Sequence, residues 1–329
     1  MKKNIFLGEE AIFDYLTPGA TGPTPAIELP KRLNPFKKNG VHIYIKLMQS
    51  VPLANIKSLP AWYMLDAIPR KELSKIKNLV EYSSGNTVMS LAILSRHFGI
   101  PNMHAIITPD VPKNKQNFLR LVGAKLIISH GPPSPDVHGK VGGIWDAVQM
   151  GKKKSWRNLN QYVNPENPKA SSKIIGQELW QQFGKNIDIL CASLGTGGTV
   201  LGSGSYLKKK IPNLFVIATS IKRGSSIPGP RGEDAVKKLG LPWESAADLE
   251  LPIATKPAFA MSLKLIREGL FVGPSTGMQL YGIMQTLVKM KKAGKLKRKK
   301  TNVVFIACDT MFPYIEDYFA VLPEKLSKK

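Results

Sequence analysis

The sequence predicts an α/β protein made of two doubly wound, three-layer domains with a ligand cleft between them. Strand-like apolar stretches alternate with helix-like ones from about Val41 onward, which is the pattern of parallel sheets covered by helices. A glycine-rich loop at Gly195–Thr199 joins one such strand to one such helix. The 329 residues are enough for two domains that share a cleft.

The first predicted block has the order βαβαβ. Apolar periodicity predicts strands over 79–82, 103–107 and 125–129, and helices over 86–98 and 114–122. The first of these helices ends at Gly99, and Pro101 follows it, as is usual at a helix C-terminus. Strands joined in this way form a parallel sheet with right-handed crossovers.

The second block predicts strands over 187–193, 214–220 and 303–307, and a helix over 200–210. The Lys-rich stretch Lys291–Lys300 is expected to be an exposed loop before the last strand. In open parallel sheets, ligands bind beyond the carboxyl ends of the strands. Three polar clusters follow predicted strands in this chain, namely Tyr82–Thr87, Gly195–Thr199 and Cys308–Thr310.

Composition argues against several classes of protein. No apolar run reaches the roughly 20 residues of a membrane span, and the first ten residues lack the apolar core of a signal peptide. Because Cys191 and Cys308 have no metal-ligand spacing, we expect a reducing cytoplasm and no metal site. The net charge of +24 would suit nucleic acid, but the lysines are scattered and no recognition motif accompanies them, so nucleic acid is not the expected partner.

The loop Gly195–Thr199, with the sequence GTGGT, has the composition of a phosphate cradle. Its glycines let the backbone approach an anion, Thr196 and Thr199 can add hydroxyl donors, and the following helix offers free N–H groups. A dinucleotide fingerprint does not fit, because Val200 fills the slot of the third glycine, and a nucleotide P-loop does not fit, because no lysine follows Gly202. Taken alone, the loop is equally compatible with an ordinary strand-to-helix turn.

Lys57 is the only Lys or Arg between Leu47 and Pro69, in an otherwise apolar stretch. The aliphatic stem of such a lysine either carries the amine to the surface, or the amine is desolvated and takes part in the chemistry of a site. Desolvation lowers the pKa of the amine and makes it nucleophilic, as a Schiff base requires. This stretch alone leaves both possibilities open.

The loop Ser83–Thr87, with the sequence SSGNT, favours a desolvated, reactive Lys57 over one that reaches the surface. It opens the helix predicted at 86–98, so its N–H groups and hydroxyls can hold a carboxylate. A helix cap explains Ser84 or Asn86 separately, but not four polar residues around Gly85 at the end of a strand. A lysine, a carboxylate cradle and a phosphate cradle together describe an amino acid joined to pyridoxal 5'-phosphate.

Ordered motifs span nearly the whole chain: TGPTPAIELP, NIKSLPA around Lys57, EYSSGNT, LNQYVNPENPKASSKIIGQELW, ASLGTGGTVLGSGSYLK, EGLFVGPSTG and CDTMFPYIEDYF. On these motifs the chain resembles the cysteine synthase / cystathionine β-synthase family of pyridoxal-phosphate enzymes, which have fold type II. The resemblance implies that the cofactor lies in the cleft between the domains. It also implies a smaller domain of residues 42–158, carrying the substrate-carboxylate loop and the Schiff-base lysine, and a larger domain of residues 1–41 and 159–329, carrying the phosphate loop.

The resemblance also implies a role for each candidate residue. Lys57 would form the Schiff base with the cofactor and act as general base at the substrate Cα. The other cofactor contacts would be Asn86 at the ring hydroxyl, Ser275 at the pyridine nitrogen, and Gly195, Thr196, Gly197, Gly198 and Thr199 at the phosphate. The substrate carboxylate would be bound by Ser83, Ser84, Gly85, Thr87 and Gln161. A neutral serine at the pyridine nitrogen suits β-elimination and β-replacement better than transamination.

The implied reaction is a pyridoxal-phosphate-dependent β-replacement on a serine-type amino acid through an aminoacrylate intermediate. O-acetylserine or a similar donor would react with sulfide or a thiol, and sulfide would give L-cysteine. The resemblance further implies a homodimer. The alternatives are a β-eliminating lyase, a synthase of another β-substituted alanine and, from another class, a non-catalytic basic nucleic-acid-binding protein.

The chain departs from the family pattern around the lysine and near the substrate. Val51–Pro52 and Ser58–Leu59 stand where the family usually has Asn-Pro and Asp-Arg. Met48 replaces an acidic residue, and Thr219–Ser220 replaces a Glu-Pro pair. The resemblance is therefore more specific for the fold and the cofactor than for the donor and the nucleophile.

Overall fold

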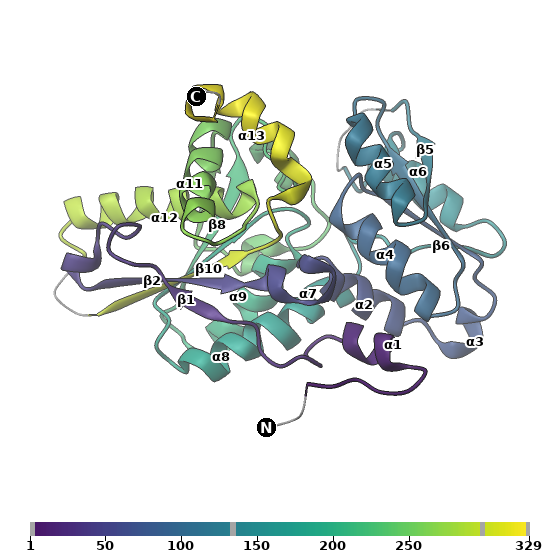
Figure 1. The fold of residues 1–329 in the computed structure, drawn as a ribbon, viewed down its shortest axis with the longest axis horizontal. Coiled ribbons are helices and arrows are strands. Elements are labelled where there is room, and N and C mark those ends of the chain that lie inside the picture. Colours follow the sequence, from purple (N-terminus) through teal and green to yellow (C-terminus); the bar gives the residue numbers. More distant parts are fainter. Residues whose placement is uncertain (1–3, 132–135, 297–299, 327–329) are drawn as a thin grey trace.

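The computed structural model describes residues 4–131, 136–296 and 300–326. These residues form two lobes, each built on one sheet with helices on both faces (Figure 1). The lobe at the left of the figure contains the larger sheet, and the blue lobe at the right contains the smaller one. The α/β class predicted from the alternation of apolar segments is confirmed.

The larger sheet has six strands in the order β1-β2-β10-β7-β8-β9. β1 pairs antiparallel with β2, and the other neighbouring pairs are parallel. A parallel sheet that is covered on both faces needs strands that are apolar throughout, and six of the seven residues of β10 are buried. The strands are β1 (Ala26–Glu28), β2 (Val41–Leu47), β7 (Ile189–Ser193), β8 (Phe215–Ile221), β9 (Leu249–Ile253) and β10 (Thr301–Ala307).

Helices cover the two faces of the larger sheet and create two separate apolar cores. Leu280 of α12 shares one core with Phe305 of β10, and Val200 of α9 shares the other with the next residue of that strand, Ile306. The helices of this lobe are α7 (Glu166–Ser171), α8 (Gln177–Phe183), α9 (Gly198–Lys210), α10 (Glu233–Val236), α11 (Thr255–Arg267), α12 (Pro274–Lys292), α13 (Ile315–Val321) and α14 (Pro323–Leu326).

The smaller sheet has four parallel strands in the order β5-β4-β3-β6. Leu79 of β3 belongs to the core beneath α4, whereas the next residue, Val80, belongs to the core beneath α6, because successive side chains of a strand face opposite sides. The elements are β3 (Asn78–Tyr82), β4 (Asn102–Ile107), β5 (Ala124–Ile128), β6 (Trp156–Asn158), α2 (Ser58–Asp66), α3 (Arg70–Leu73), α4 (Asn86–His97), α5 (Lys113–Leu121) and α6 (Gly143–Gly151).

The limits predicted above for strands and helices agree with the observed ones to within two residues.

One strand lies in a different lobe from the one in which the predicted domain division places it. The predicted division begins the smaller domain at residue 42, but β2 pairs with β10 in the larger sheet. Conversely, Leu16 of α1 (Ala11–Leu16) joins the core of the smaller lobe. Apolar periodicity identifies a strand but not the sheet that it joins, and the domain limits stay a prediction.

A buried ion pair joins Lys46, two residues before Met48, to an acid of a distant helix. The Nζ of Lys46 lies 2.6 Å from Oε2 of Glu178, which belongs to α8. The same oxygen accepts hydrogen bonds from the N–H and the hydroxyl of Thr24, each at 2.9 Å. Burial lowers the pKa of Lys46, and Glu178 opposes this effect. Glu178 thus supplies the negative charge that pairs with buried Lys46.

In the parts of the chain that the structure describes, no helix is both long and apolar enough to span a membrane. The expected loop Lys291–Lys300 is described only in part. Lys291 and Lys292 belong to the last turn of α12, and residues 297–299 lie outside the described residues.

Candidate active site

A cavity of about 630 Å³ is lined by residues of both lobes, and its volume falls in the range of small-molecule sites. The structure brings together here predicted residues from segments far apart in the chain. Those that line the cavity are Lys57, Ser83, Ser84, Gly85, Asn86, Thr87, Gln161, Gly195 and Thr196. The predicted residues outside its lining are Gly197, Gly198, Thr199 and Ser275.

The loop Gly195–Thr199 presents free backbone donors at the start of α9. Among the described residues, nothing accepts a hydrogen bond from the N–H groups of Gly195, Thr196 or Gly197. α9 begins directly after them, at Gly198, so the positive end of a 13-residue helix lies at the same place. This arrangement fits a phosphate group.

Two glycines of this loop are required by its geometry. Gly197 has a φ of +85°, which favours glycine. A Cβ on Gly198 would lie 2.2 Å from Oδ1 of Asn167, so no larger residue fits there without movement. Asn167 in turn donates from Nδ2 to Oγ1 of Thr196 at 2.8 Å and to the carbonyl of Gln161 at 2.6 Å. The phosphate loop is therefore tied to the segment that carries Gln161.

Lys57 precedes α2, and its amine lies at the cavity. Its Nζ is 3.6 Å from the position that a Cβ on Gly195 would occupy, which places the amine beside the phosphate loop. Burial lowers the pKa of this amine; Cys308 and Asp309 oppose the effect, while Arg231 adds to it. The side chain is thus desolvated at a ligand site, as a Schiff-base lysine requires.

Asn55, which the sequence analysis missed, holds the backbone at this lysine. Its Oδ1 accepts from the N–H of Lys57 at 2.9 Å, and its Nδ2 donates to the carbonyl of Leu53 at 2.7 Å. Leu53 and Ala54 have φ values of 68° and 53°, a conformation that residues other than glycine rarely adopt. The sequence offers one sign of this role, namely that Asn55 is a single asparagine in an apolar stretch, two residues before Lys57.

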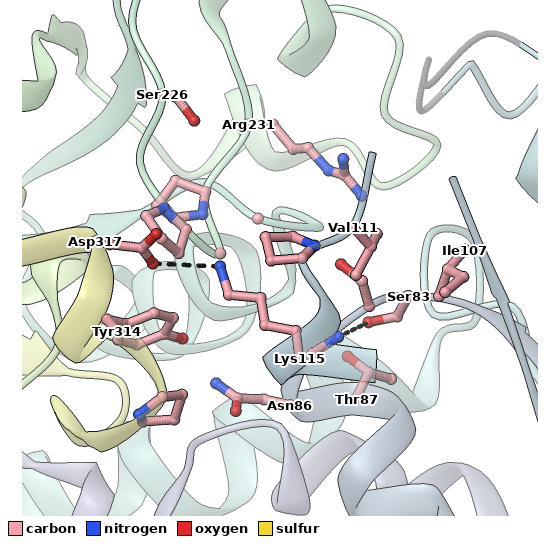
Figure 2. Close-up of a pocket in the computed structure, with 18 of the residues that line it drawn as sticks. Ser83, Asn86, Thr87, Ile107, Val111, Lys115, Ser226, Arg231, Tyr314 and Asp317 are labelled. Atoms are coloured by element: carbon pink, nitrogen blue, oxygen red, sulfur yellow. Dashed lines mark hydrogen bonds and ion pairs between the residues drawn. The ribbon is translucent and has the colours of Figure 1, made fainter. Parts of the chain in front are cut away.

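The loop Ser83–Thr87 leads into α4 and is anchored by side chains of distant segments. Nδ2 of Asn86 donates to Oδ2 of Asp309 at 2.7 Å, and Oγ1 of Thr87 donates to Oε1 of Gln161 at 2.7 Å. Asn86 and Thr87 lie side by side along the cavity in Figure 2. Both anchors tie the smaller lobe to segments that follow it in the chain.

Glu81 is a buried acid on β3, just before this loop, and was not predicted as part of the site. It accepts hydrogen bonds from backbone N–H groups of Gln161, Tyr82 and Asn160, and from the amide of Asn158 at 3.3 Å. Burial raises the pKa of Glu81 to about 8, although these donors oppose the effect. The carboxyl group therefore supports the segment that brings Gln161 to Thr87.

Two further cations on the cavity wall were also missed. Arg231 donates to the hydroxyl of Tyr162, and its guanidinium lies 5.7 Å from the centre of that ring. Within the described chain, Arg231 forms no ion pair with a carboxylate. Lys115 extends toward Asp317 of α13, and the two charged atoms are 3.3 Å apart (Figure 2). The charge of Arg231 is thus available to a second anionic group, besides those bound by the two loops.

Ser275 lies in the first turn of α12, and it is buried. Its hydroxyl hydrogen-bonds with the thiol of Cys308, whose sulfur is also 3.6 Å from the hydroxyl of Ser193. Burial raises the pKa of Cys308, and the nearby charge of Lys57 opposes this. Ser275 therefore belongs to the shell of side chains around the lysine, although it does not line the cavity.

Comparison with known proteins agrees with this chemistry. Residues 18–309 match the family model described as "Pyridoxal-phosphate dependent enzyme". Cysteine synthase B of Escherichia coli (strain K12) is 30% identical over 294 residues, which cover 88% of this chain and 90% of that protein. Cysteine synthase of Aquifex aeolicus (strain VF5) is 30% identical over 277 residues, covering 83% and 84%. The solved structure of O-ureido-L-serine synthase has a TM-score of 0.75 at 21% identity, covering 93% and 96%.

The chain therefore belongs to the pyridoxal-phosphate-dependent enzymes, and within them to the cysteine synthase group of fold type II. The predicted cofactor is confirmed by this membership. The residues present also fit it, because a desolvated lysine lies next to a loop whose N–H groups are free. The role of each single residue stays a prediction.

Proposed function

We propose that this enzyme catalyses β-replacement on a serine-type amino acid, with O-acetylserine or a similar donor and sulfide giving L-cysteine. The observation that carries the proposal is the position of Lys57. Its amine lies beside Gly195 of the proposed phosphate cradle, and it lines the same cavity as the proposed carboxylate cradle at Ser83–Thr87. The cysteine synthases among its relatives support the same reaction class.

When bound, pyridoxal phosphate supplies the electron sink that stabilises charge at the substrate Cα. The chain supplies binding and proton transfer. The backbone of Gly195–Thr199 holds the phosphate, and Asn86 and Ser275 contact the ring. Ser83, Ser84, Gly85, Thr87 and Gln161 hold the substrate carboxylate. Lys57 would remove the Cα proton as general base, which requires an uncharged amine and is favoured by the burial that lowers its pKa.

Much of the rate enhancement would arise because one cavity holds these groups in a productive orientation, and well-oriented reactants reach effective molarities of about 10⁵–10⁸ M.

The charges on the cavity wall also bear on which amino-acid donor the enzyme accepts. Arg231 adds a positive charge that no carboxylate of the described residues pairs with, whereas Lys115 is paired with Asp317 on the same wall. We therefore propose that the enzyme accepts donors with an anionic leaving group, such as O-phosphoserine, alongside O-acetylserine.

A direct test starts from the purified protein and added cofactor. Wild type should develop the visible absorption of a lysine-bound cofactor, and borohydride should bleach it. Lys57→Ala should remain folded, as judged by circular dichroism, and lack this band. A wild type that forms no band with cofactor present would rule out the proposed function.

The reaction type needs a second test. O-acetylserine, O-phosphoserine, serine and cysteine would be supplied in turn, with and without sulfide, while pyruvate and cysteine are measured. β-Replacement predicts cysteine from a serine-type donor only when sulfide is present. Pyruvate formation at the same rate with and without sulfide would instead identify a β-eliminating lyase.

Two accompanying predictions have different sources: the homodimer comes from the family, and the cytoplasm from the cysteine content of the chain. We propose that the enzyme is a homodimer and works in the cytoplasm. Sedimentation at micromolar concentration tests the first, with a monomer as the contrary result. Fractionation of cells that express the full chain tests the second.

A further inference from the structure

Asp309 is a buried acid whose carboxylate is fixed from three sides. Its Oδ2 accepts hydrogen bonds from Nδ2 of Asn86 at 2.7 Å and from the hydroxyl of Tyr314 at 2.6 Å. Its Oδ1 is buried and has no hydrogen-bond partner among the described residues. A Cβ on Gly273 would lie 2.2 Å from Oδ1, so the backbone of that glycine closes the third side. The carboxylate therefore has one position available to it.

This carboxylate belongs to the shell behind the cavity, on a segment whose backbone pairs with the residues just before Lys57: Asp309 bridges with Asn55, and the carbonyl of Cys308 accepts from the N–H of Ile56 at 2.7 Å. Asn86 lines the cavity and Asp309 does not. The ionisable groups that face Asp309 are Lys57, Tyr314, Cys308 and Tyr318. Of these, only Lys57 can bring a positive charge, and its charge lowers the pKa of Asp309. Burial outweighs this effect and the hydrogen bonds, so that the pKa of Asp309 is raised to about 6.

The hydrogen-bond pattern determines how Asn86 is oriented. An ionised carboxylate accepts hydrogen bonds only, so the NH₂ end of the Asn86 amide must face Asp309, and the flipped amide would set two oxygens against each other. One hydrogen of that NH₂ group is used by Asp309, and the amide also hydrogen-bonds with Tyr314, so these two side chains together fix its orientation at the cavity wall. The orientation of a residue proposed to contact the cofactor ring thus depends on an acid 223 positions away in the chain.

We infer that Asp309 is a positioning residue, which orients the amide of Asn86 toward the cofactor ring and supplies the negative charge that keeps the cofactor-bound nitrogen of Lys57 protonated. The inference rests on the proposed function, because it assumes that Lys57 and Asn86 contact the cofactor. An opposite charge close to an ionisable nitrogen favours its protonated form. Asp309 acts through these two residues and does not itself touch the substrate.

Asp309 also holds the backbone in place, and a purely structural role of this kind predicts a different result from the positioning role. Its carbonyl accepts from the N–H of Gly273 at 3.0 Å, and its backbone pairs with that of Asn55. The loss of such contacts would lower thermal stability. It would not move the pH at which the cofactor changes its absorption.

The experiment is a pH titration of the visible absorption of the holoenzyme in wild type, Asp309→Asn and Asp234→Asn. Asp309→Asn removes the charge at nearly constant volume, and the midpoint of deprotonation should fall by about one pH unit. Asp234→Asn removes the same charge at an exposed position, where Asp234 pairs with Arg223, and should leave the midpoint unchanged. A midpoint in Asp309→Asn equal to that of wild type, with cofactor bound, would overturn the inference.

Tyr314→Phe provides a second variant in case Asp309→Asn does not fold. It removes one donor from the carboxylate and no charge, so it should raise the pKa of Asp309 above about 6. A carboxylate with fewer donors attracts the protonated nitrogen more strongly, so the midpoint of deprotonation should move to higher pH than in wild type. A midpoint that stays at the wild-type value, with cofactor bound, would count against Asp309. The proposed function fails differently, namely if wild type forms no band or if Lys57→Ala retains it.

Discussion

The two sides of the cavity are built by different means. The side proposed to hold the cofactor phosphate is made of backbone: free N–H groups at Gly195, Thr196 and Gly197, a left-handed Gly197, and a Gly198 pressed against Asn167. The side proposed to bind the substrate is made of side chains that meet from distant segments, such as Thr87 with Gln161. A backbone cradle tolerates little change of volume, whereas a side-chain network depends on each donor having its acceptor. The two sides should therefore fail in different ways when they are mutated.

Gly198→Ala should give the largest effect and should act on the cofactor. The added methyl group would lie 2.2 Å from Oδ1 of Asn167, and overpacking of about 1–3 kcal/mol corresponds to cofactor binding weakened about 5- to 150-fold. A cofactor titration followed by absorption measures this change. At Gly232 the nearest atom to an added Cβ is 3.8 Å away, so Gly232→Ala should bind cofactor as wild type does. Equal affinities for all three proteins would show that this loop does not hold the cofactor.

Thr87→Val should act on the substrate instead. It removes the donor to Oε1 of Gln161 in a buried position, and an unsatisfied buried group costs about 1–3 kcal/mol. We expect the KM of the donor amino acid to rise about tenfold with cofactor affinity unchanged, while Thr87→Ser restores the hydroxyl and the wild-type KM. If Thr87→Val weakened cofactor binding as strongly as Gly198→Ala, the two sides would not be independent.

Arg231→Gln should separate anionic from neutral donors on the substrate side. Hydrogen bonds to charged groups contribute about 1.5–3 kcal/mol, so kcat/KM for O-phosphoserine should fall at least about tenfold. The value for O-acetylserine should change much less, because its leaving group is neutral before the reaction. Steady-state kinetics at constant ionic strength compares the two donors. An equal fall for both would mean that Arg231 has no part in donor selection.

Ala54→Gly should have the smallest effect and should leave both sides of the cavity intact. The φ of 53° at Ala54 is unfavourable for an L-residue, and Ala54 is exposed, so glycine removes strain with little loss of packing. After the entropy cost of glycine, we expect a gain of about 0.5 kcal/mol in the free energy of unfolding, measured with urea. Ala67→Gly, at an ordinary φ of −74° after α2, should lose about that amount. A loss at both positions would contradict the strain at Ala54.

The same contrast explains how much the sequence could predict. The phosphate loop, Lys57 and the strand ends are local, because a glycine pattern, a lone lysine or a run of apolar residues specifies backbone within a few positions. The pairs Asn86–Asp309 and Lys46–Glu178 join residues 223 and 132 positions apart, and no local pattern shows which polar side chains will meet. Membership of β2 in the larger sheet escaped for the same reason. Arg231 follows a Pro/Gly-rich turn that identifies a loop but not its position at the cavity.

The central claim is that Lys57 is the lysine that binds the cofactor, and covalent trapping tests it most directly. The holoenzyme would be reduced with borohydride, digested and analysed by mass spectrometry for the lysine that carries the added pyridoxyl group. The structure places Lys57 at the phosphate loop, so the label should lie on the peptide containing Lys57 in nearly stoichiometric amount. A label on Lys115 or on any other lysine, with Lys57 unmodified, would contradict the account.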